Sequence, residues 1–388
     1  MLPFKNVMIL DLTHVLAGPY ATYQFALLGA DVIKVENPTD PDCARGRGPS
    51  IDLAAEGRGL NYMVQAANKR ALALDLKTKV GREAFLRLAE RADVVVENYS
   101  PGVMDTLDLS ADLLMKRNPR LIHCSINGFG GGAGSAQSLK AYDNVIQAAS
   151  GNMAQTGKSG PPVKTGASMI DYFTGMSAAF AISAALHERA ASGVGQHVQC
   201  AMFDCALALM APEIAAHLFE GARRTVPSEA GLGTYDTADG QLMLGAFTPE
   251  QVRTLWRSLG EAEFVVEGWD DVWKSSPAMR ERLTTIFATE TASEWEARLN
   301  GVGIPAQRVR TLDEALADPA LARPHFLKAL RTHAGDVTVP LSPFTLERDG
   351  PTITAPPPRV GEHGEAILRE HGFDESEIAS LRSEGAIP

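Results

Sequence analysis

The first third of the chain alternates short apolar runs with helix signals, and this alternation constrains the fold more than any other feature. The runs that predict strands lie at residues 7–10, 32–35, 71–76, 93–96 and 121–126. The helices predicted between them cover residues 21–28, 80–91 and 111–117. Strands that alternate with helices form a parallel sheet with helices on both faces and right-handed crossovers. Ligands of such sheets bind outside the carboxyl ends of the strands, so we expect a site there.

The pattern changes after about residue 205, and a chain of 388 residues is long enough for two domains. Short strands and amphipathic helices, for example at 249–259 and 293–299, predict a smaller α+β unit. We therefore expect an α/β fold with a Rossmann-like large domain and a second, smaller domain. The predicted parts are the large domain over 1–205, a linker over 206–229, the small domain over 230–330, and a C-terminal segment over 331–388 that returns to the large domain.

Charge and cysteine content narrow the possible partners and compartments. The formal net charge of −11 argues against nucleic acid as a main partner. The spacing of the four cysteines fits neither a metal site nor a disulfide framework, which predicts free thiols in a reducing compartment such as the cytoplasm. These cysteines are Cys43, Cys124, Cys200 and Cys205.

The apolar segments do not predict a membrane protein. The first residues carry no basic region or cleavage site typical of a signal peptide. The most apolar long stretch, residues 169–186, carries Asp171 and is interrupted by Thr174, Gly175 and Ser177. It predicts a buried helix and not a membrane span.

Asp171 is the candidate catalytic residue, because it places one carboxylate in the first turn of this alanine-rich helix. Free backbone amides and the positive end of the helix dipole favour the ionised carboxylate, which is a candidate nucleophile. A purely structural role fits the same pattern, since Ser168 and Asp171 match the spacing of a helix capping box. The spacing alone leaves both interpretations open.

Other motifs carry weaker signals. The glycine run at 128–133 can be aligned with a dinucleotide fingerprint, but the first strand–helix unit has Ala17-Gly18-Pro19 where that fingerprint belongs. A glycine loop near a ligand is therefore favoured over a nicotinamide site. The histidines show no metal-binding spacing, and no GxSxG elbow occurs, so neither a metal nor serine chemistry is expected.

Basic residues gather in loop-like places of the N-terminal half, where a phosphorylated ligand of a parallel sheet would bind. They are Arg45, Arg47, Arg58, Lys69, Arg70, Lys77 and Lys140.

Taken together, the segments resemble the class III CoA-transferases, the CaiB–BaiF and formyl-CoA transferase group. The matching segments are LAGP at 16–19, LGADVIKVE at 28–36, NKR at 68–70, LDLK at 74–77, VVVEN at 94–98, PG at 101–102, KAYD at 140–143, DxxTG at 171–175, GxGQ at 193–196 and GEH at 361–363. Each motif is weak alone, whereas the ordered set is specific and extends from about residue 5 to the C-terminus. The match is loose over 225–330.

The resemblance implies that Asp171 is the catalytic aspartate and that no metal or nicotinamide is needed. It implies contacts to coenzyme A, bound as an acyl-CoA substrate, from His14, Val15, Leu16, Ala17, Leu74, Lys77, Asn98, Tyr99, Lys140 and Tyr142. Formyl-CoA transferase has arginines where this chain has Asn37 and Thr106, so we expect phosphate contacts at Asn37 to differ and to move to Arg45 or Lys69. Gly231 and Gly233 fall near the glycine loop that covers the acyl site in the family.

The resemblance also implies a mechanism and an assembly. The Asp171 carboxylate would attack a donor acyl-CoA, and an acyl anhydride and an aspartyl-CoA thioester would carry the transfer to an acceptor acid. The family further implies an interlocked homodimer.

Two other functions remain open. The α-methylacyl-CoA racemases share the fold, but they carry a histidine base where this chain has Tyr142, whose ordinary pKa of about 10 makes it a poor base. A CoA-binding regulatory protein with an inactive site is the third possibility.

Overall fold

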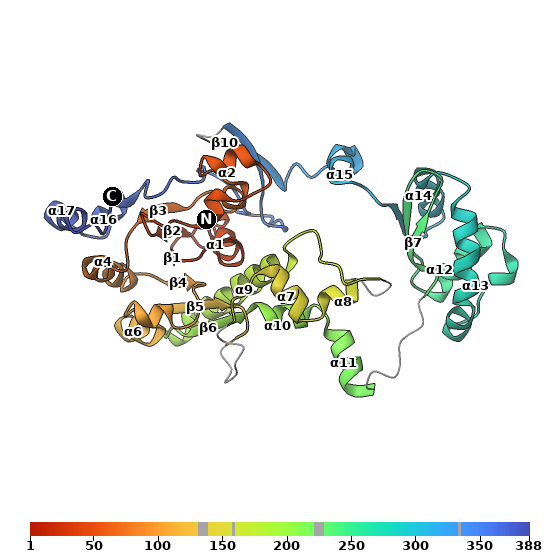
Figure 1. Ribbon diagram of the computed structural model, residues 1–388, viewed down its shortest axis with the longest axis horizontal. Helices are drawn as coiled ribbons and strands as arrows, with labels where there is room; N and C mark the ends of the chain where they lie inside the picture. The colour runs from red at the N-terminus through yellow and green to blue at the C-terminus, as the bar shows by residue number, and fades with distance from the viewer. Residues whose placement is uncertain (131–138, 157–159, 221–228, 333–334) are drawn as a thin grey trace. The chain divides into compact units, whose positions relative to one another are not determined.

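The computed structural model describes residues 1–130, 139–156, 160–220, 229–332 and 335–388. The chain divides into two compact units, drawn in Figure 1: Met1–Ile214 with Arg323–Pro388, and Ala215–Ala322. The first unit extends to Ile214, inside the segment 206–229 that was expected as a linker. The segment 323–330, expected in the small domain, belongs to the first unit.

The first unit is built on a parallel sheet with the strand order β3-β2-β1-β4-β5-β6. Its strands are β1 (Met8–Asp11), β2 (Asp31–Glu36), β3 (Arg70–Ala73), β4 (Val94–Glu97), β5 (Ile122–Asn127) and β6 (His197–Ala201). A separate antiparallel pair is formed by β10 (Leu327–Thr332) and β11 (Gly335–Pro340). The predicted parallel sheet is confirmed, and its strand order is that of a Rossmann fold.

The helices of this unit follow the strands and cover the sheet. They are α1 (Ala17–Leu27), α2 (Ile51–Ala55), α3 (Leu60–Met63), α4 (Lys79–Ala89), α5 (Val103–Thr106), α6 (Ala111–Arg117), α7 (Asp143–Ala149), α8 (Asn152–Thr156), α9 (Met169–Ser192), α10 (Met202–Ala208), α16 (Gly364–Glu370) and α17 (Glu375–Ser383). Helix α11 (Ala211–Glu220) spans the boundary between the units, and a 3-10 helix, η1, covers Cys43–Gly46.

Successive side chains of each strand point to opposite faces of the sheet, and both faces are covered by helices. Ile9 of β1 is paired with Val94 of β4, and both belong to a buried cluster with residues of α1 and α9. The next pair, Leu10 and Val95, belongs to a second cluster with residues of α4, α6, α16 and α17. Strands buried on both faces appear in the sequence as continuous apolar runs, because no face meets water. Full burial of each such side chain contributes about 1.5–3 kcal/mol.

Helix α9 is the predicted apolar helix around Asp171, and it packs against α1 at a glycine. A Cβ atom added to Gly175 would lie 2.5 Å from the carbonyl oxygen of Ala17, so only glycine permits this approach. Among the described residues, α9 is the only unbroken helix that is long and apolar enough to cross a membrane. Of its most apolar stretch of 18 residues, 44% is buried inside the protein. Its Ala178, Ile182 and Ala185 lie in the core beneath the sheet.

The second unit joins an antiparallel sheet of order β7-β8-β9 to helices. Its elements are β7 (Leu232–Asp236), β8 (Gln241–Gly245), α12 (Pro249–Ser258), η3 (Ala262–Phe264), α13 (Trp269–Phe287), α14 (Ala292–Gly301), β9 (Ala306–Arg308), α15 (Leu312–Ala317) and η4 (Pro319–Leu321). Trp256, Phe287 and Trp295 are almost completely buried in its own core.

Candidate active site

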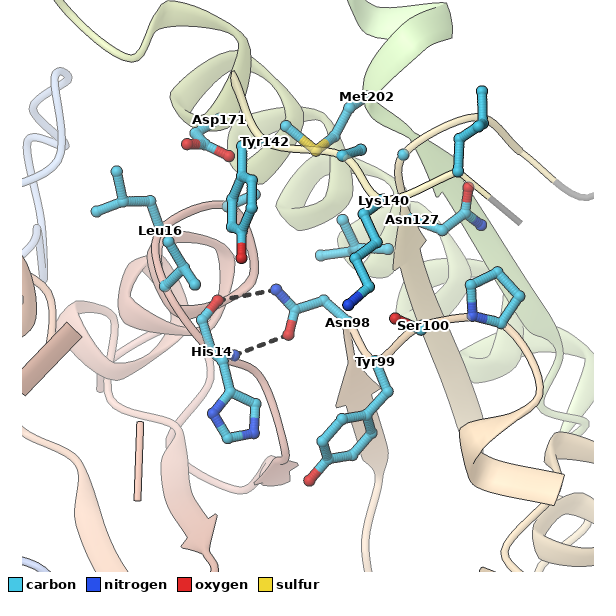
Figure 2. Close-up of a pocket in the computed structure, with 17 residues that line it drawn as sticks. His14, Leu16, Asn98, Tyr99, Ser100, Asn127, Lys140, Tyr142, Asp171 and Met202 are labelled. Carbon is cyan, nitrogen blue, oxygen red and sulfur yellow. Dashed lines mark hydrogen bonds between the residues drawn. The ribbon is translucent and has the colours of Figure 1, made fainter. Parts of the chain in front are cut away.

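A cavity of about 270 Å³ opens where the strand order of the parallel sheet reverses, beyond the carboxyl ends of β1, β4 and β5. Its walls come from residues 14–17 after β1, 98–101 after β4, 126–128 at the end of β5 and 139–142, together with Asp171 and Met202. Figure 2 shows these segments around the cavity. The position is the one in which open parallel sheets bind ligands.

An amide side chain joins the two central strands at this point. The backbone N–H of His14 donates to Asn98 Oδ1 at 2.7 Å, and Asn98 Nδ2 donates to the carbonyl oxygen of His14 at 2.8 Å (Figure 2). The segment after β1 is thus held to the segment after β4 in a fixed register. The His14 ring also lies against the Tyr99 ring, with 5.3 Å between centroids, and burial lowers the pKa of His14.

Val15 adopts a backbone conformation that a β-branched residue rarely takes, with φ of +70°. Such a conformation costs on the order of 1–3 kcal/mol and persists only where the surroundings fix it. Here the N–H of Val15 donates to Asp42 Oδ1 at 3.0 Å, and its carbonyl oxygen accepts from Gln65 Nε2 at 2.7 Å. Helix α1 then begins at Ala17, so the unpaired first-turn amides of a helix lie at the cavity wall.

Asp171 lies in the first turn of α9, as predicted, and its side chain reaches the cavity. The close contact at Gly175, one turn further along α9, brings this helix start next to Leu16 and Ala17 of the same cavity. The capping role is not found: the Ser168 side chain makes no cap hydrogen bond, and no described residue donates one to the Asp171 carboxylate. Instead Asp143 Oδ2 accepts the N–H groups of Ile170 and Asp171, at 2.8 and 3.3 Å.

The expected ionisation of Asp171 is wrong in direction. Burial, followed by the negative charge of Asp143, raises the pKa of Asp171 from 3.8 to about 7. The helix amides that were expected to lower this pKa are occupied by Asp143, so their field stabilises the other carboxylate.

The segment 139–142 closes one side of the cavity because glycine leaves room for it. A Cβ added to Gly128 would lie 2.2 Å from the Cβ of Ala141. Lys140 and Tyr142 flank this contact, and in Figure 2 the Lys140 side chain extends toward Asn98. Lys140 is the one lysine or arginine among the described residues that line the cavity.

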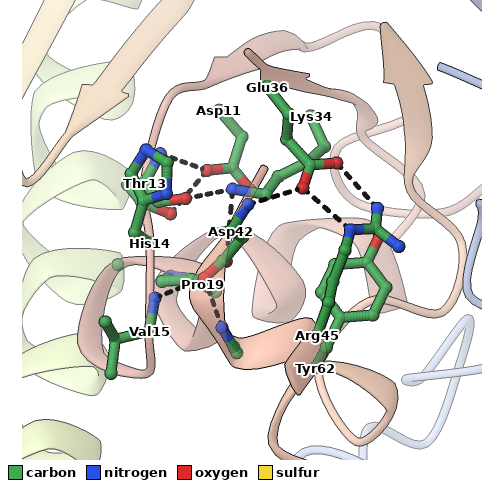
Figure 3. A network of polar contacts seen from close by, with 12 residues as sticks. Asp11, Thr13, His14, Val15, Pro19, Lys34, Glu36, Asp42, Arg45 and Tyr62 are labelled. Atoms are coloured by element: carbon green, nitrogen blue, oxygen red, sulfur yellow. Dashed lines mark hydrogen bonds and ion pairs between the residues drawn. The ribbon is translucent and has the colours of Figure 1, made fainter. Parts of the chain in front are cut away.

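Arg45 and Lys69, predicted as substitute phosphate contacts, are buried in a separate polar network and do not line the cavity (Figure 3). Arg45 binds both carboxylate oxygens of Glu36, at 2.9 and 2.7 Å, and its guanidinium lies 3.7 Å from the centroid of the Tyr62 ring. Lys69 Nζ donates to Asp11 Oδ2 at 2.9 Å. Neither residue reaches the cavity, because Lys69 Nζ donates further to Thr22 and to the carbonyl oxygen of Pro19, and Arg45 donates further to Tyr62 and to the carbonyl oxygen of Pro358.

The same network supports the cavity wall from behind. Lys34 Nζ donates to the carbonyl oxygen of Thr13 and lies 3.5 Å from Asp42 Oδ2, while the other oxygen of Asp42 holds Val15. Burial alone would raise the pKa of Asp11, but Lys69 and Lys34 outweigh it and hold that pKa below its usual range. Lys34 and Asp42 thus hold the turn after β1 in place, although neither side chain lines the cavity.

Three further predicted contacts lie outside the cavity. Asn37 Nδ2 donates to Asp75 Oδ1 at 3.1 Å, and its own Oδ1 accepts the N–H groups of Thr39 and Asp40. Leu74 is buried just after β3, whereas Lys77 is exposed.

The predicted glycine loops are found only in part. Gly231 is a turn residue directly before β7, whereas Gly233 lies inside that strand, opposite Leu244 of β8. Residues 131–138 of the glycine run are outside the described residues, while Gly128 lines the cavity.

The sequence patterns did not identify four residues as part of the site. Asn127, Ser100 and Met202 line the cavity, and Asp143 contacts the backbone of Asp171. Asp143 could have been suspected from its place in KAYD, immediately before a predicted turn into helix. Within the described residues, no group of three or more His, Cys, Asp or Glu side chains could hold a metal ion. All four cysteines are free, as predicted.

Comparison with known proteins agrees with this geometry. The model of CoA-transferase family III matches residues 4–364. The succinate–glutarate CoA-transferase of Agrobacterium fabrum is 33% identical over 383 residues, covering 95% of each chain. The succinyl-CoA:mesaconate CoA-transferase of Haloarcula hispanica is 35% identical over 382 residues, covering 95% of this chain and 96% of the relative.

Solved structures show the same fold. Rv3272 of Mycobacterium tuberculosis matches with a TM-score of 0.83 and 30% identity, over 94% of this chain and 99% of that one. A CaiB/BaiF family protein of Brucella suis matches with a TM-score of 0.80 and 31% identity, over 95% of this chain and 99% of that one. With the cavity at the sheet's switch point and these matches along nearly its whole length, the chain belongs to CoA-transferase family III and is an enzyme of that family.

Proposed function

We propose that this enzyme moves CoA from a short dicarboxylyl-CoA, of the succinyl-CoA type, to a carboxylic acid acceptor through covalent intermediates on Asp171. The observation that carries the proposal is the position of Asp171. It is a mostly buried carboxylate, without a described hydrogen-bond donor, in the cavity that also contains His14 to Ala17, Asn98, Tyr99, Lys140 and Tyr142. A carboxylate without donors keeps its lone pairs available for attack.

The transfer would take four steps. The Asp171 carboxylate attacks the thioester carbonyl of the donor, and the C–S bond breaks to give an acyl–aspartyl anhydride and CoA thiolate. The thiolate attacks the aspartyl carbonyl, which forms the aspartyl-CoA thioester and releases the donor acid. The acceptor carboxylate displaces the thiolate to form a second anhydride, and the thiolate then attacks the acceptor acyl carbon. Acceptor acyl-CoA leaves, and the Asp171 carboxylate is regenerated with no net gain or loss of protons.

Each step develops negative charge on a carbonyl oxygen, which amide donors can stabilise. The first-turn amides of α1, next to Leu16 and Ala17, are the proposed donors. The anhydrides also require that water be kept out. Gly231 and Gly233 remain proposed contacts of the acyl group.

The donor class is proposed from the relatives. The relatives from Agrobacterium and Haloarcula are named for succinate, glutarate, succinyl-CoA and mesaconate, all dicarboxylates or their thioesters. Lys140 supplies a cation to the cavity for an anionic group, and we propose that it binds CoA. Lys77, exposed beyond β3, is proposed as a second contact with the CoA phosphates, with Leu74 beside it.

We also propose an interlocked homodimer in the cytoplasm. Large apolar side chains are exposed on α9 and α11, including Phe180 at 78%, Leu218 at 80% and Phe219 at 90% exposure. Exposed apolar side chains of this size are typical of surfaces that a partner covers. Light scattering coupled to gel filtration tests the dimer.

The covalent mechanism is tested by trapping. Purified enzyme is incubated with succinyl-CoA and then with hydroxylamine or borohydride, and the peptide containing Asp171 is analysed by mass spectrometry. A mass change at Asp171 in the wild type, and none in Asp171→Ala, is expected. An unmodified peptide during turnover would exclude the covalent mechanism.

A panel of acyl-CoA donors and acceptor acids identifies the substrates, with mass detection of the new thioester. The racemase alternative is tested with a 2-methylacyl-CoA in deuterated water. Deuterium at the α-carbon without any acceptor acid would favour the racemase, whereas transfer without deuterium exchange is expected.

A further inference from the structure

Asp143 lies where two helices begin and contacts both of them. It is the first residue of α7, and its Oδ2 accepts the N–H groups of Ile170 and Asp171 at the start of α9. Its exposed fraction is 5%. A carboxylate at a helix N-terminus satisfies amides that have no partner inside the helix. The 24-residue helix that carries Asp171 is therefore capped by a residue 28 positions earlier in the chain.

The other oxygen of Asp143 is held by a side chain whose orientation is itself fixed. Gln147 is fully buried, and its Nε2 donates to Asp143 Oδ1. Gln147 Oε1 accepts from the N–H of Thr165 at 3.0 Å and from its hydroxyl at 3.2 Å. A backbone N–H can only donate, so Gln147 must present its NH₂ group to Asp143. Both oxygens of Asp143 are acceptors, which is the arrangement of a carboxylate.

On the basis of the proposed function, we propose that Asp143 is a positioning residue for the reaction. It fixes the start of α9 so that Asp171 faces the cavity, and it takes the helix amides that would otherwise stabilise the Asp171 anion. Asp171 is thereby kept a basic, reactive carboxylate.

The surroundings of Asp171 support this assignment. The titratable side chains that line the cavity with Asp171 or lie against the start of its helix are His14, Tyr20, Tyr99, Lys140, Tyr142, Asp143, Tyr172 and Cys205. Asp143 is the one carboxylate among them, and its charge adds to burial in raising the pKa of Asp171. A like charge nearby disfavours the ionised form of a carboxyl group and so raises its pKa.

The test exchanges the carboxylate of Asp143 and the amide of Gln147, whose side chains contact each other. Asp143→Asn removes the charge but sets two NH₂ groups against each other, because Gln147 also donates at this point. The double variant Asp143→Asn with Gln147→Glu restores an NH₂ to carboxylate contact and leaves an oxygen for Thr165. It keeps the net charge while moving the carboxylate one side chain further from Asp171. Asp204→Asn, an exposed carboxylate in the first turn of α10, is the matched control.

Two readouts are taken on the full-length enzyme. The first is the pH dependence of kcat/KM for CoA transfer from succinyl-CoA, and the second is the titration of the Asp171 carboxyl carbon by NMR with ¹³C-labelled aspartate. The Asp171 resonance is assigned by its loss in Asp171→Asn. We expect the midpoint to fall by about one pH unit or more in Asp143→Asn, to lie between that value and the wild type in the double variant, and to stay unchanged in Asp204→Asn.

An unchanged NMR midpoint in folded Asp143→Asn, or in the double variant if the single one does not fold, would overturn the role of Asp143. The NMR titration does not depend on turnover. Failure of the proposed transfer reaction would appear as an absent product in the wild type and is thereby distinguished from failure of this inference.

Discussion

Replacing Asp171 with asparagine should stabilise the protein while abolishing transfer, and the size of the effect follows from the pKa of the carboxyl group. The folded protein raises this pKa from 3.8 to about 7, so the folded state holds its proton over a range where the unfolded chain has lost it. Stability of the wild type therefore falls as pH rises from about 4 to about 7, and the loss is complete above that range. The asparagine side chain has nearly the shape of the protonated acid and carries no charge to bury.

The pH dependence gives the magnitude. The interval from 3.8 to about 7 is about three pH units, and each unit corresponds to about 1.4 kcal/mol. Linkage then gives Asp171→Asn an advantage in unfolding free energy of about 2 kcal/mol at pH 5 and about 4 kcal/mol at pH 8. The increase between the two pH values, about 2 kcal/mol, is the diagnostic quantity, since effects of shape or packing do not depend on pH.

Thermal and urea unfolding at pH 5 and pH 8, at one protein concentration, measure this difference. Constant concentration matters because a dimer gains stability by mass action. Asp204→Asn, which removes an exposed carboxylate, should change stability by less than about 0.5 kcal/mol at both pH values. An advantage of Asp171→Asn that is equal at pH 5 and pH 8, or absent at both, would refute the raised pKa.

Three further results are expected. The wild-type kcat/KM should rise with pH and level off above about 7, as the free enzyme's Asp171 ionises; a profile already flat from pH 5 would contradict this. Lys69→Met should lower the unfolding free energy by about 3–5 kcal/mol in urea titration, because it leaves the Asp11 carboxylate buried without its closest cation; a loss below about 1 kcal/mol would show that Lys34 and the hydroxyls suffice. Gly175→Ala should lower kcat at least about tenfold because α9 must move away from α1, whereas Gly301→Ala, which has open space around it, should leave activity unchanged.

The large unit was predictable because its signals are local. The apolar runs at 7–10 and 121–126 are strands buried on both faces, and their composition alone indicates this. Strand β6 was not among the runs that predicted the sheet, since His197 and Gln199 at this sheet edge are exposed and polar and interrupt its apolar signal. Helix α13 was missed as well, in a stretch with an internal Pro277 that normally argues against a helix.

Arg45 and Lys69 were misplaced for one reason: the sequence does not show which charged residues form ion pairs with each other in the fold. Arg45 pairs with Glu36 nine residues away, but Lys69 pairs with Asp11 across 58 residues and a strand crossing. Both looked like free cations at the edge of a sheet, which is where phosphates bind. Only the folded chain shows that their donors are already used, and that Lys140 is the cation at the cavity among the residues described.

The same cause explains the two interpretations of Asp171 that the sequence left open. A carboxylate in the first turn of a helix is either a cap or a candidate nucleophile, and the choice depends on which side chain accepts the helix amides. Here Asp143, which arrives from a different helix and is held by Gln147, accepts them. The helix start that would have stabilised Asp171 now holds it in position, while burial keeps it basic. In the proposed mechanism, position and reactivity are thus supplied by two different carboxylates, and neither role could be assigned from one of them alone.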